Sequence, residues 1–299
     1  MKKRQSLFSI IILSLICMNA YSLPTLRFTG NMNPYYGDNS LNDMNYRTTL
    51  KSDNPAFNSR NIIATSQPWS LAKAKLVLKE SDIQNPKEVT MIDLRSEFHA
   101  YVHIDKPLNV NIPELGYDMT MQEGWYDIST LDDAEGEVTL DKQQKLLNDI
   151  KQYINTNKSL PITVKYKSPT VDNPSAKEAF TYSYPVDDIK FEQDIAENYL
   201  GINYIRVPVK DWSPISPEAA DMLVNYYNTK MTPVTWIHCW GGIGRTGQAI
   251  GVMLTLILKP NTWAALSSNI VSFNNNSIIT EEKEQVQFVY NFWEKHHSI

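Results

Sequence analysis

A glycine-rich segment, His238–Gly247, dictates local structure more strongly than any other part of this chain. It holds four glycines around one cysteine and one arginine, in the order His-Cys-Trp-Gly-Gly-Ile-Gly-Arg-Thr-Gly. A β-prone run, 234–237, precedes it, and a nearly unbroken apolar run, 248–258, follows it and stops before Pro260. The pattern predicts a strand, then a tight loop, then a buried helix.

A glycine-rich loop that leads into a helix is suited to bind an anion. Backbone N–H groups without helical partners converge there, and the helix dipole adds positive potential. Arg245 adds a planar, permanently charged group that can bind two phosphate oxygens. The same field would stabilise a thiolate on Cys239, which we expect to be the nucleophile. We expect phosphate to be bound by Arg245 and by the backbone amides of the loop, those of Trp240, Gly241, Gly242, Ile243 and Gly244.

Other interpretations of this loop fit less well. A buried, inert cysteine would not need an arginine at this spacing. A nucleotide-binding P-loop would need Gly-Lys-Ser/Thr, which is not there. A metal site would need more ligands: the chain has two cysteines and five histidines, and they form no convincing set. We therefore expect no metal ion and no other cofactor.

The first 22 residues have the pattern of a secretory signal peptide. Three basic residues, 2–4, precede an apolar run, 7–18, and the small residues Ala20 and Ser22 suit a cleavage site. The apolar run is short for a membrane span. We therefore expect export, to the periplasm or beyond, with no stable membrane span after cleavage. An uncleaved anchor is the alternative.

Composition narrows the class of protein and of partner. The chain has 299 residues, 42% apolar and 20% charged, as in a globular protein of one large or two modest domains. Its net charge of -5 becomes more negative once the basic leader is removed. This excludes a nucleic-acid binder that relies on a general basic field. A polyanionic substrate would have to be attracted by a local basic patch.

A cysteine that attacks a bound phosphate ester needs a carboxylic acid from elsewhere in the chain, because an alkoxide leaving group requires a proton. Asp211 is the best candidate. It lies in a proline-rich segment before an expected helix, whose start is marked by Ser216 and Pro217. The order loop, helix, strand, loop would bring Asp211 and Cys239 to the same end of a sheet. The alternative is that Asp211 only stabilises the turn.

The segment His238-Cys-x5-Arg245-Thr246 is the signature of the cysteine-dependent protein tyrosine phosphatase superfamily. Four further stretches resemble motifs of the bacterial protein tyrosine phosphatase-like phytases, also called inositol polyphosphate phosphatases. They are Asn45-Tyr-Arg47, Ala64–Ser70, Asp93-Leu-Arg-Ser-Glu97-Phe-His99 and Asp211–Glu218. The signature loop departs from the phytase pattern by its bulky Trp240, and it has no lysine of the kind that phosphoinositide phosphatases often carry there.

The resemblance implies an α/β fold with a phosphatase core, a central mainly parallel sheet flanked by helices, and a small β-rich inserted domain. On that basis we divide the chain into a signal peptide (1–22), an N-terminal arm with the first part of the core (23–105), the insert (106–186) and the rest of the core (187–299). Residues 23–60 are expected to form an irregular arm.

The resemblance also implies roles for individual residues. Asp211 would be the general acid, and Arg47 would bind a phosphate of the substrate. Glu97 would support the loop as part of a polar network. Thr246 would donate a hydrogen bond to the departing thiolate, and His238 would order the loop or serve only as a core histidine.

Three functions remain open at this point. The first is an exported phosphomonoesterase that hydrolyses myo-inositol polyphosphates such as phytate through a phosphocysteine intermediate. The second is a phosphatase with the same chemistry that acts on phosphotyrosine in proteins, with or without dual specificity, or on phosphoinositides, as a secreted effector. The third is a non-catalytic phosphate-binding module, against which the intact Cys239, Arg245, Thr246 and Asp211 argue.

Overall fold

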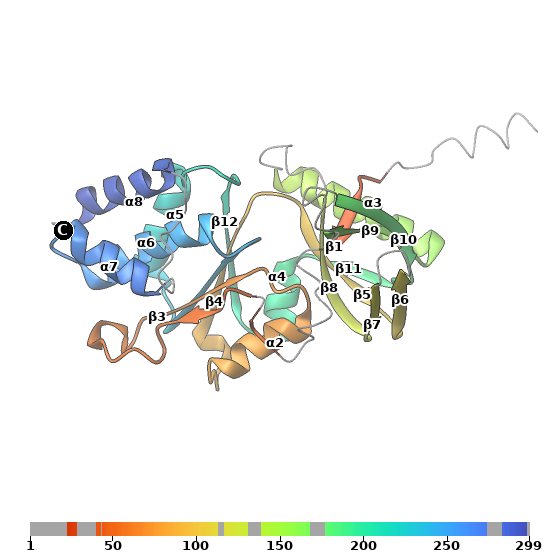
Figure 1. The fold of residues 1–299 in the computed structure, drawn as a ribbon, viewed down its shortest axis with the longest axis horizontal. Coiled ribbons are helices and arrows are strands. Elements are labelled where there is room, and N and C mark those ends of the chain that lie inside the picture. The colour runs from red at the N-terminus through yellow and green to blue at the C-terminus, as the bar shows by residue number, and fades with distance from the viewer. Residues whose placement is uncertain are drawn as a thin grey trace, which may run out of the picture.

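The structure is a computed structural model that describes residues 23–28, 40–42, 44–112, 117–130, 139–167, 177–273 and 283–297. The predicted signal peptide, 1–22, lies outside the described residues. Within them, helices gather around one sheet and a second, larger sheet lies beside it (Figure 1). None of the described helices is long and apolar enough to cross a membrane.

The first sheet has five strands and carries the glycine-rich loop. Its order is β12 (Asn203–Val209), β4 (Val89–Arg95), β13 (Val234–Cys239), β3 (Asn61–Ser66) and β2 (Arg47–Thr48). The first four are parallel, and β2 is antiparallel to β3. Every residue of β4 and β13 is buried, as expected for strands covered on both faces. The predicted strand, loop and helix around Cys239 are therefore present.

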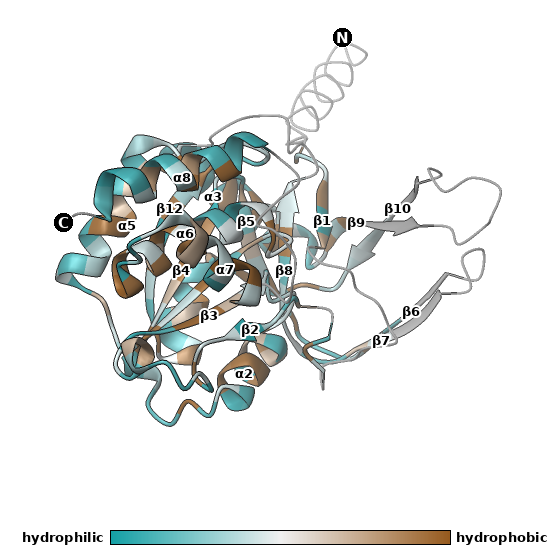
Figure 2. Ribbon diagram, turned by 60° about the vertical axis from the view of Figure 1, so that its left-hand side comes forward, coloured by the Kyte–Doolittle hydropathy of each residue, from teal (hydrophilic) through white to brown (hydrophobic). Residues whose placement is uncertain are grey.

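Helices cover both faces of this sheet. One face is covered by α5 (Pro217–Thr229), α6 (Gly244–Leu258), α7 (Trp263–Phe273) and α8 (Lys283–His296). The other is covered by α2 (Leu71–Glu80) and a π-helical turn, Ala196–Leu200. Hydrophobic residues are concentrated on α6 and the strands beneath it, while the outer side of α8 is largely hydrophilic (Figure 2). Side chains alternate between the two cores along each strand, so Ile62 and Ala64 pack on the first face and Ile63 on the second.

The second sheet has six strands and mixed directions. Its order is β10 (Lys177–Tyr184), β9 (Leu160–Lys167), β1 (Leu26–Phe28), β8 (Gly124–Thr130), β5 (His99–Ile104) and β11 (Asp188–Lys190). Helix α3 (Leu140–Asn157) packs against it with Leu147, Ile150 and Ile154. A hairpin of β6 (Leu108–Ile112) and β7 (Tyr117–Met121) forms a separate small sheet.

The second sheet is wider than the expected insert at 106–186, because β1, β5 and β11 lie outside those limits. The arm at 23–60 is also more regular than expected. Its strand β1 is hydrogen-bonded on both sides, antiparallel to β8 and parallel to β9. Three residues are too few to show a period-2 pattern, so a strand fixed by its neighbours could not be recognised from sequence alone.

A short link joins the two sheets. Strand β4 ends at Arg95 and β5 begins at His99, so the chain passes from one sheet to the other through only three residues, 96–98.

Helix α5 begins as predicted: the Ser216 hydroxyl accepts a hydrogen bond from the Ala219 amide at 3.2 Å, and Pro217 occupies the first turn.

Gly251 lies at a close contact between α6 and α8. A Cβ atom at this position would lie 2.5 Å from Cγ1 of Val289. We expect Gly251→Ala to lower the free energy of unfolding by about 1 kcal/mol, because overpacking costs about 1–3 kcal/mol and the gain in helix propensity returns about 1. Chemical denaturation measures this.

In a Val289→Ala background the same substitution should be neutral or stabilising, because the clash has been removed. A stabilising Gly251→Ala in the parent chain would contradict the contact.

Candidate active site

The candidate catalytic residues meet at the carboxyl ends of neighbouring parallel strands. Cys239 is the last residue of β13, Asp211 follows the end of β12, and Arg245 lies in the first turn of α6. Oδ1 of Asp211 is 3.2 Å from Nε of Arg245. Parallel strands end at the same edge of a sheet, and the structure thus places Asp211 and Cys239 at one end, as the sequence predicts.

The loop curls tightly around the sulfur of Cys239. The Gly242 amide donates a hydrogen bond to Sγ at 3.2 Å, and Cys239 is buried. Gly242 has a φ of 70°, and a Cβ there would lie 2.5 Å from the amide nitrogen of Ser66. Only glycine fits this position. Helix α6 then starts with no side-chain cap on Ile243, which leaves its first N–H groups for a ligand.

Arg245 is buried and anchored on one side. Its Nη1 donates to Oε2 of Glu97 at 2.8 Å and to the Val209 carbonyl at 3.4 Å. Its Nη2 donates to Oε1 of Glu97 at 3.4 Å. Burial would lower the pKa of Arg245, but Glu97, the Cys239 sulfur and Asp211 raise it above its ordinary value. The guanidinium is therefore held in one orientation with its charge intact.

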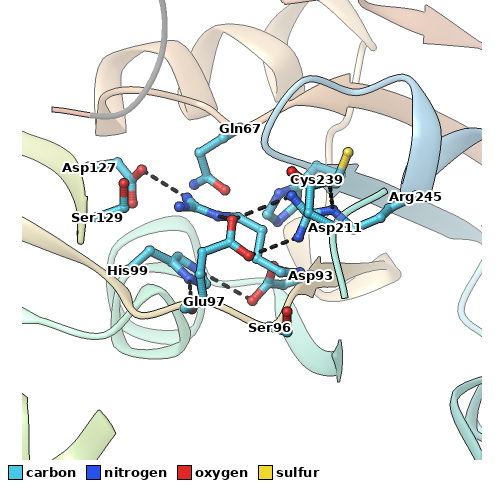
Figure 3. A network of polar contacts seen from close by, with 12 residues as sticks. Gln67, Asp93, Ser96, Glu97, His99, Asp127, Ser129, Asp211, Cys239 and Arg245 are labelled. Atoms are coloured by element: carbon cyan, nitrogen blue, oxygen red, sulfur yellow. Dashed lines mark hydrogen bonds and ion pairs between the residues drawn. The ribbon is translucent and has the colours of Figure 1, made fainter. Parts of the chain in front are cut away.

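Glu97, which contacts Arg245 (Figure 3), is held in turn by a second guanidinium, that of Arg95. Nε of Arg95 lies 2.8 Å from Oε1 of Glu97, and Nη1 of Arg95 lies 3.1 Å from Oδ2 of Asp127 on β8. Burial would raise the pKa of Glu97, but Arg95 and Arg245 hold it well below its usual range. The chain of contacts Arg245–Glu97–Arg95–Asp127 thus joins the site to the six-stranded sheet.

A second buried cluster lies beneath the loop. Asp93, Glu192 and His238 present ligand-type atoms within 4.8 Å of one another, a set that could hold a metal cation. However, the ring of His99 already lies between the two carboxylates, with Nε2 at 3.2 Å from Asp93 Oδ2 and 3.0 Å from Glu192 Oε2. The Tyr204 hydroxyl also donates to Asp93 at 2.7 Å. Nε of Arg206 lies 3.6 Å from the same Asp93 oxygen, so His99 and Arg206 together balance the two carboxylates.

His99 carries a proton on each ring nitrogen. Its Nδ1 faces the Glu97 carbonyl at 3.2 Å, while Nε2 faces the carboxylates, and both positions require a donor. Burial and Arg95 would lower the pKa of His99, but Asp93 and Glu192 raise it to about 9. In return, and against burial, His99 helps to hold the pKa of Asp93 well below its usual range.

His238 and Thr246 are fully buried, and neither ring nitrogen of His238 nor Oγ1 of Thr246 has a hydrogen-bond partner among the described residues. This fits the alternative of His238 as a core histidine. The Gly242 amide donates to Sγ here, and the hydrogen bond from Thr246 to the departing thiolate stays a prediction. His238 Nε2 lies 3.5 Å from Glu192 Oε2, so its closest charged neighbour belongs to the buried cluster.

Two glutamines fix the segment that carries Asp211. Oε1 of Gln248 accepts from the Ile215 amide at 2.9 Å, and its Nε2 donates to the Ser213 carbonyl at 3.1 Å. Gln285 on α8 donates to the same carbonyl at 3.2 Å. The role of neither residue was recognised from the sequence. The signal for Gln248 was an amide side chain at the start of a nearly unbroken apolar run.

The basic residues of the arm take different places. Nη2 of Arg47 donates to the Gly242 carbonyl at 2.7 Å, so its contact in this structure is with the loop itself. Burial lowers the pKa of Arg47 to about 10, although the Cys239 sulfur opposes this. Arg60 stacks on Tyr227 of α5, 4.5 Å from the ring centre. From β1, Arg27 lies over the Trp240 ring at 5.7 Å.

The pKa of His99 makes stability depend on pH. A raised pKa in the folded state stabilises the fold fully below about pH 6.5, and this contribution is lost as pH rises through about 9. We expect the free energy of unfolding to fall by up to about 3 kcal/mol from this group over that interval. Urea titrations at several pH values measure it.

His99→Gln should remove that part of the pH dependence. If that variant fails to fold, the imidazole of His99 followed by NMR in the parent chain gives the same answer. A midpoint near 6.5 would contradict the arrangement.

Comparison with known proteins agrees with this geometry. Residues 185–257 match a family described as "Tc-R-P: Polymorphic toxin system, DSP-PTPase phosphatase". No curated protein shows significant sequence similarity to the chain.

The fold is similar to two solved structures. One is the PTP-like myo-inositol phosphatase from Mitsuokella multacida in complex with myo-inositol-(1,3,4,5)-tetrakisphosphate, at a TM-score of 0.61 and 16% identity, where 91% of this chain matches 44% of that one. The other is a PTP-like phytase from Bdellovibrio bacteriovorus, at a TM-score of 0.57 and 16% identity, where 92% of this chain matches 91% of that one. The chain therefore spans less than half of the Mitsuokella chain.

The matched segment 185–257 contains Asp211, Cys239 and Arg245, the three residues that the fold brings together. Residues 185–257 thus match a DSP-PTPase phosphatase family, and the chain has a fold similar to that of the PTP-like phytases.

Proposed function

We propose that this protein hydrolyses phosphomonoesters of inositol polyphosphates through a phosphocysteine intermediate. The observation that carries the proposal is the meeting of Cys239, Arg245 and Asp211 at one end of the five-stranded sheet, with Asp211 Oδ1 3.2 Å from Arg245 Nε. These three groups supply a nucleophile, an oxyanion binder and a proton donor.

In the first step the Cys239 thiolate attacks phosphorus in line with the leaving oxygen. The S–P bond forms as the P–O bond breaks, and Asp211 donates its proton to the leaving alkoxide. The loop amides and Arg245 stabilise the charge on the other phosphoryl oxygens. The carboxyl of Asp211 suits this role because its side chain is 41% exposed and reaches the site from the rim.

In the second step water replaces the sulfur. The carboxylate of Asp211 takes a proton from the attacking water, the new O–P bond forms, and the S–P bond breaks. Inorganic phosphate leaves and the Cys239 thiolate is restored, so no external oxidant or reductant is needed.

Inositol polyphosphates are favoured as substrates by two observations. The two structures compared above, which share the fold of this chain, are described as a PTP-like myo-inositol phosphatase and a PTP-like phytase. Cationic side chains also contact the loop: Arg47 donates to the Gly242 carbonyl, and Arg27 lies over the Trp240 ring. They would bring positive potential to the site of a protein whose net charge is negative.

A second candidate is an aryl phosphate such as a phosphotyrosyl peptide. Three large apolar side chains are exposed next to the catalytic residues: Trp212 at 78%, Trp240 at 40% and Ile243 at 53%. A flat aromatic alcohol would pack against such side chains better than a polyol would.

We also propose that the protein is exported, with residues 1–22 as its signal peptide, on the sequence pattern described above. Detection of the processed chain outside the cytoplasm would test this.

Initial rates on phytate, a phosphotyrosyl peptide and a phosphoinositide under one condition test the substrate class. We expect the highest kcat/KM on phytate, because several phosphates can use the surrounding cations. A kcat/KM tenfold higher on either of the other two esters would contradict this choice.

Cys239→Ser should lose more than about 10³-fold in kcat while still binding tungstate, because a serine hydroxyl is a poor nucleophile in the same loop. Normal turnover in that variant would overturn the proposed chemistry.

Asp211→Asn should slow the first turnover of an inositol phosphate by about 10²-fold or more, since its alkoxide needs the proton. The first-turnover burst of p-nitrophenol from p-nitrophenyl phosphate should fall less than about tenfold, because that leaving group is stable without one. Rapid-mixing kinetics measure both rates.

Asp221→Asn, at an exposed position of α5, is the matched control and should leave both rates unchanged. Equal losses on both esters in Asp211→Asn would exclude the acid role.

A further inference from the structure

Three successive carbonyl groups of the phosphate loop accept hydrogen bonds from one part of the chain. The Trp240 carbonyl accepts from the Gln67 amide at 3.2 Å. The Gly241 carbonyl accepts from Nδ2 of Asn45 at 2.7 Å. The Gly242 carbonyl accepts from Nη2 of Arg47 at 2.7 Å. All three donors lie in residues 45–67, on the outside of the loop.

Because the peptide bond is planar, carbonyl groups that point out of the loop leave the neighbouring N–H groups pointing into it. In a trans peptide the N–H of one residue points opposite to the C=O of the residue before it. Fixing the carbonyls of 240, 241 and 242 outward therefore turns the N–H groups of 241, 242 and 243 inward. The hydrogen bond from the Gly242 amide to Cys239 Sγ, at 3.2 Å, has the orientation that this argument requires.

The donors are themselves held by the sheet. Arg47 belongs to β2, where it pairs with Ala64 of β3. The Met44 carbonyl accepts from the Ser66 amide at 2.7 Å, which fixes the start of the same segment. Asn45 has a φ of 47°, in the left-handed region that asparagine tolerates better than most residues. The donor groups thus keep their places when no anion is bound.

We propose that Asn45 and Arg47 are positioning residues that hold the amides of the phosphate loop in their anion-binding orientation. The inference rests on the proposed function only in taking the loop as the phosphate site. Asn45 is uncharged, so its effect separates loop geometry from the general attraction that Arg47 would exert on any anion. Preorganised amides are effective because they need not reorient as charge develops.

Tungstate binding in a Cys239→Ser background tests the proposal without turnover. We expect Asn45→Gly to weaken binding at least fivefold, since glycine keeps the left-handed backbone and removes only the donor. Arg47→Met should weaken it at least tenfold, and Arg47→Lys should recover part of the loss. Calorimetry gives the dissociation constants.

Two exposed residues of the same arm provide matched controls. Asn42→Gly repeats the asparagine change, and Lys51→Met repeats the loss of charge, and both should stay within twofold of the parent. Melting temperatures should stay within about 2 °C for Asn45→Gly. A structural role alone would lower the melting temperature without a selective loss of tungstate affinity.

Unchanged affinity in Asn45→Gly would overturn the proposal, even if Arg47→Met binds more weakly, because the effect would then be one of charge. Equal losses in Asn45→Gly and Asn42→Gly would overturn it as well. In the otherwise unchanged active enzyme, kcat of Asn45→Gly should fall more than KM rises. A parent chain that binds tungstate but hydrolyses no phosphate ester would refute the proposed function and leave this inference standing.

Discussion

The largely buried carboxylate of Glu97, whose side chain is 12% exposed, is the constraint on which the site depends. A lone carboxylate in this position would be costly, and two guanidinium groups, those of Arg95 and Arg245, compensate for its burial. Glu97 lies in the three-residue link between β4 and β5, so one side chain ties the five-stranded sheet, the six-stranded sheet and the phosphate loop together. Removing Glu97 would leave the two guanidinium groups without the carboxylate between them, and for this reason the network behaves as a unit.

The same network explains how Arg245 can be both rigid and available. Glu97 and the Val209 carbonyl occupy one side of its guanidinium, and its Nε makes no hydrogen bond with the described residues. Asp211 faces that open side as an ion pair, from a segment fixed by Gln248 and Gln285. A phosphoryl group entering here meets an oriented cation, with the carboxyl group at the edge of its leaving oxygen. The six-stranded sheet contributes through Asp127 of β8, whose carboxylate forms an ion pair with Arg95.

Local sequence patterns predicted much of the fold around the site, whereas contacts between residues far apart in the sequence could not be predicted. The strand, loop and helix at Cys239 and the start of α5 at Ser216 follow from spacing, glycine content and capping, all of which lie within a few residues. The placement of Asp211 followed from the order of elements in parallel sheets. The bond from Asn45 to the loop joins residues 196 apart, and that from His99 to Glu192 joins residues 93 apart, so no pattern in the sequence could reveal them. Helix α7 was not expected at all, although its residues form a regular helix against α6 and α8.

The place of β13 in its sheet has a consequence for how the chain reaches this state. β13 lies between β3 and β4, and both are made long before it during synthesis. Those two strands cannot pair with each other in the native register, so each keeps an open edge until residues 234–239 arrive. Contacts across such long stretches of sequence form slowly. Cys239 is therefore placed by the same strand that completes the sheet. A ribosome-bound chain that ends before β13 lacks both the central strand of this sheet and the candidate nucleophile.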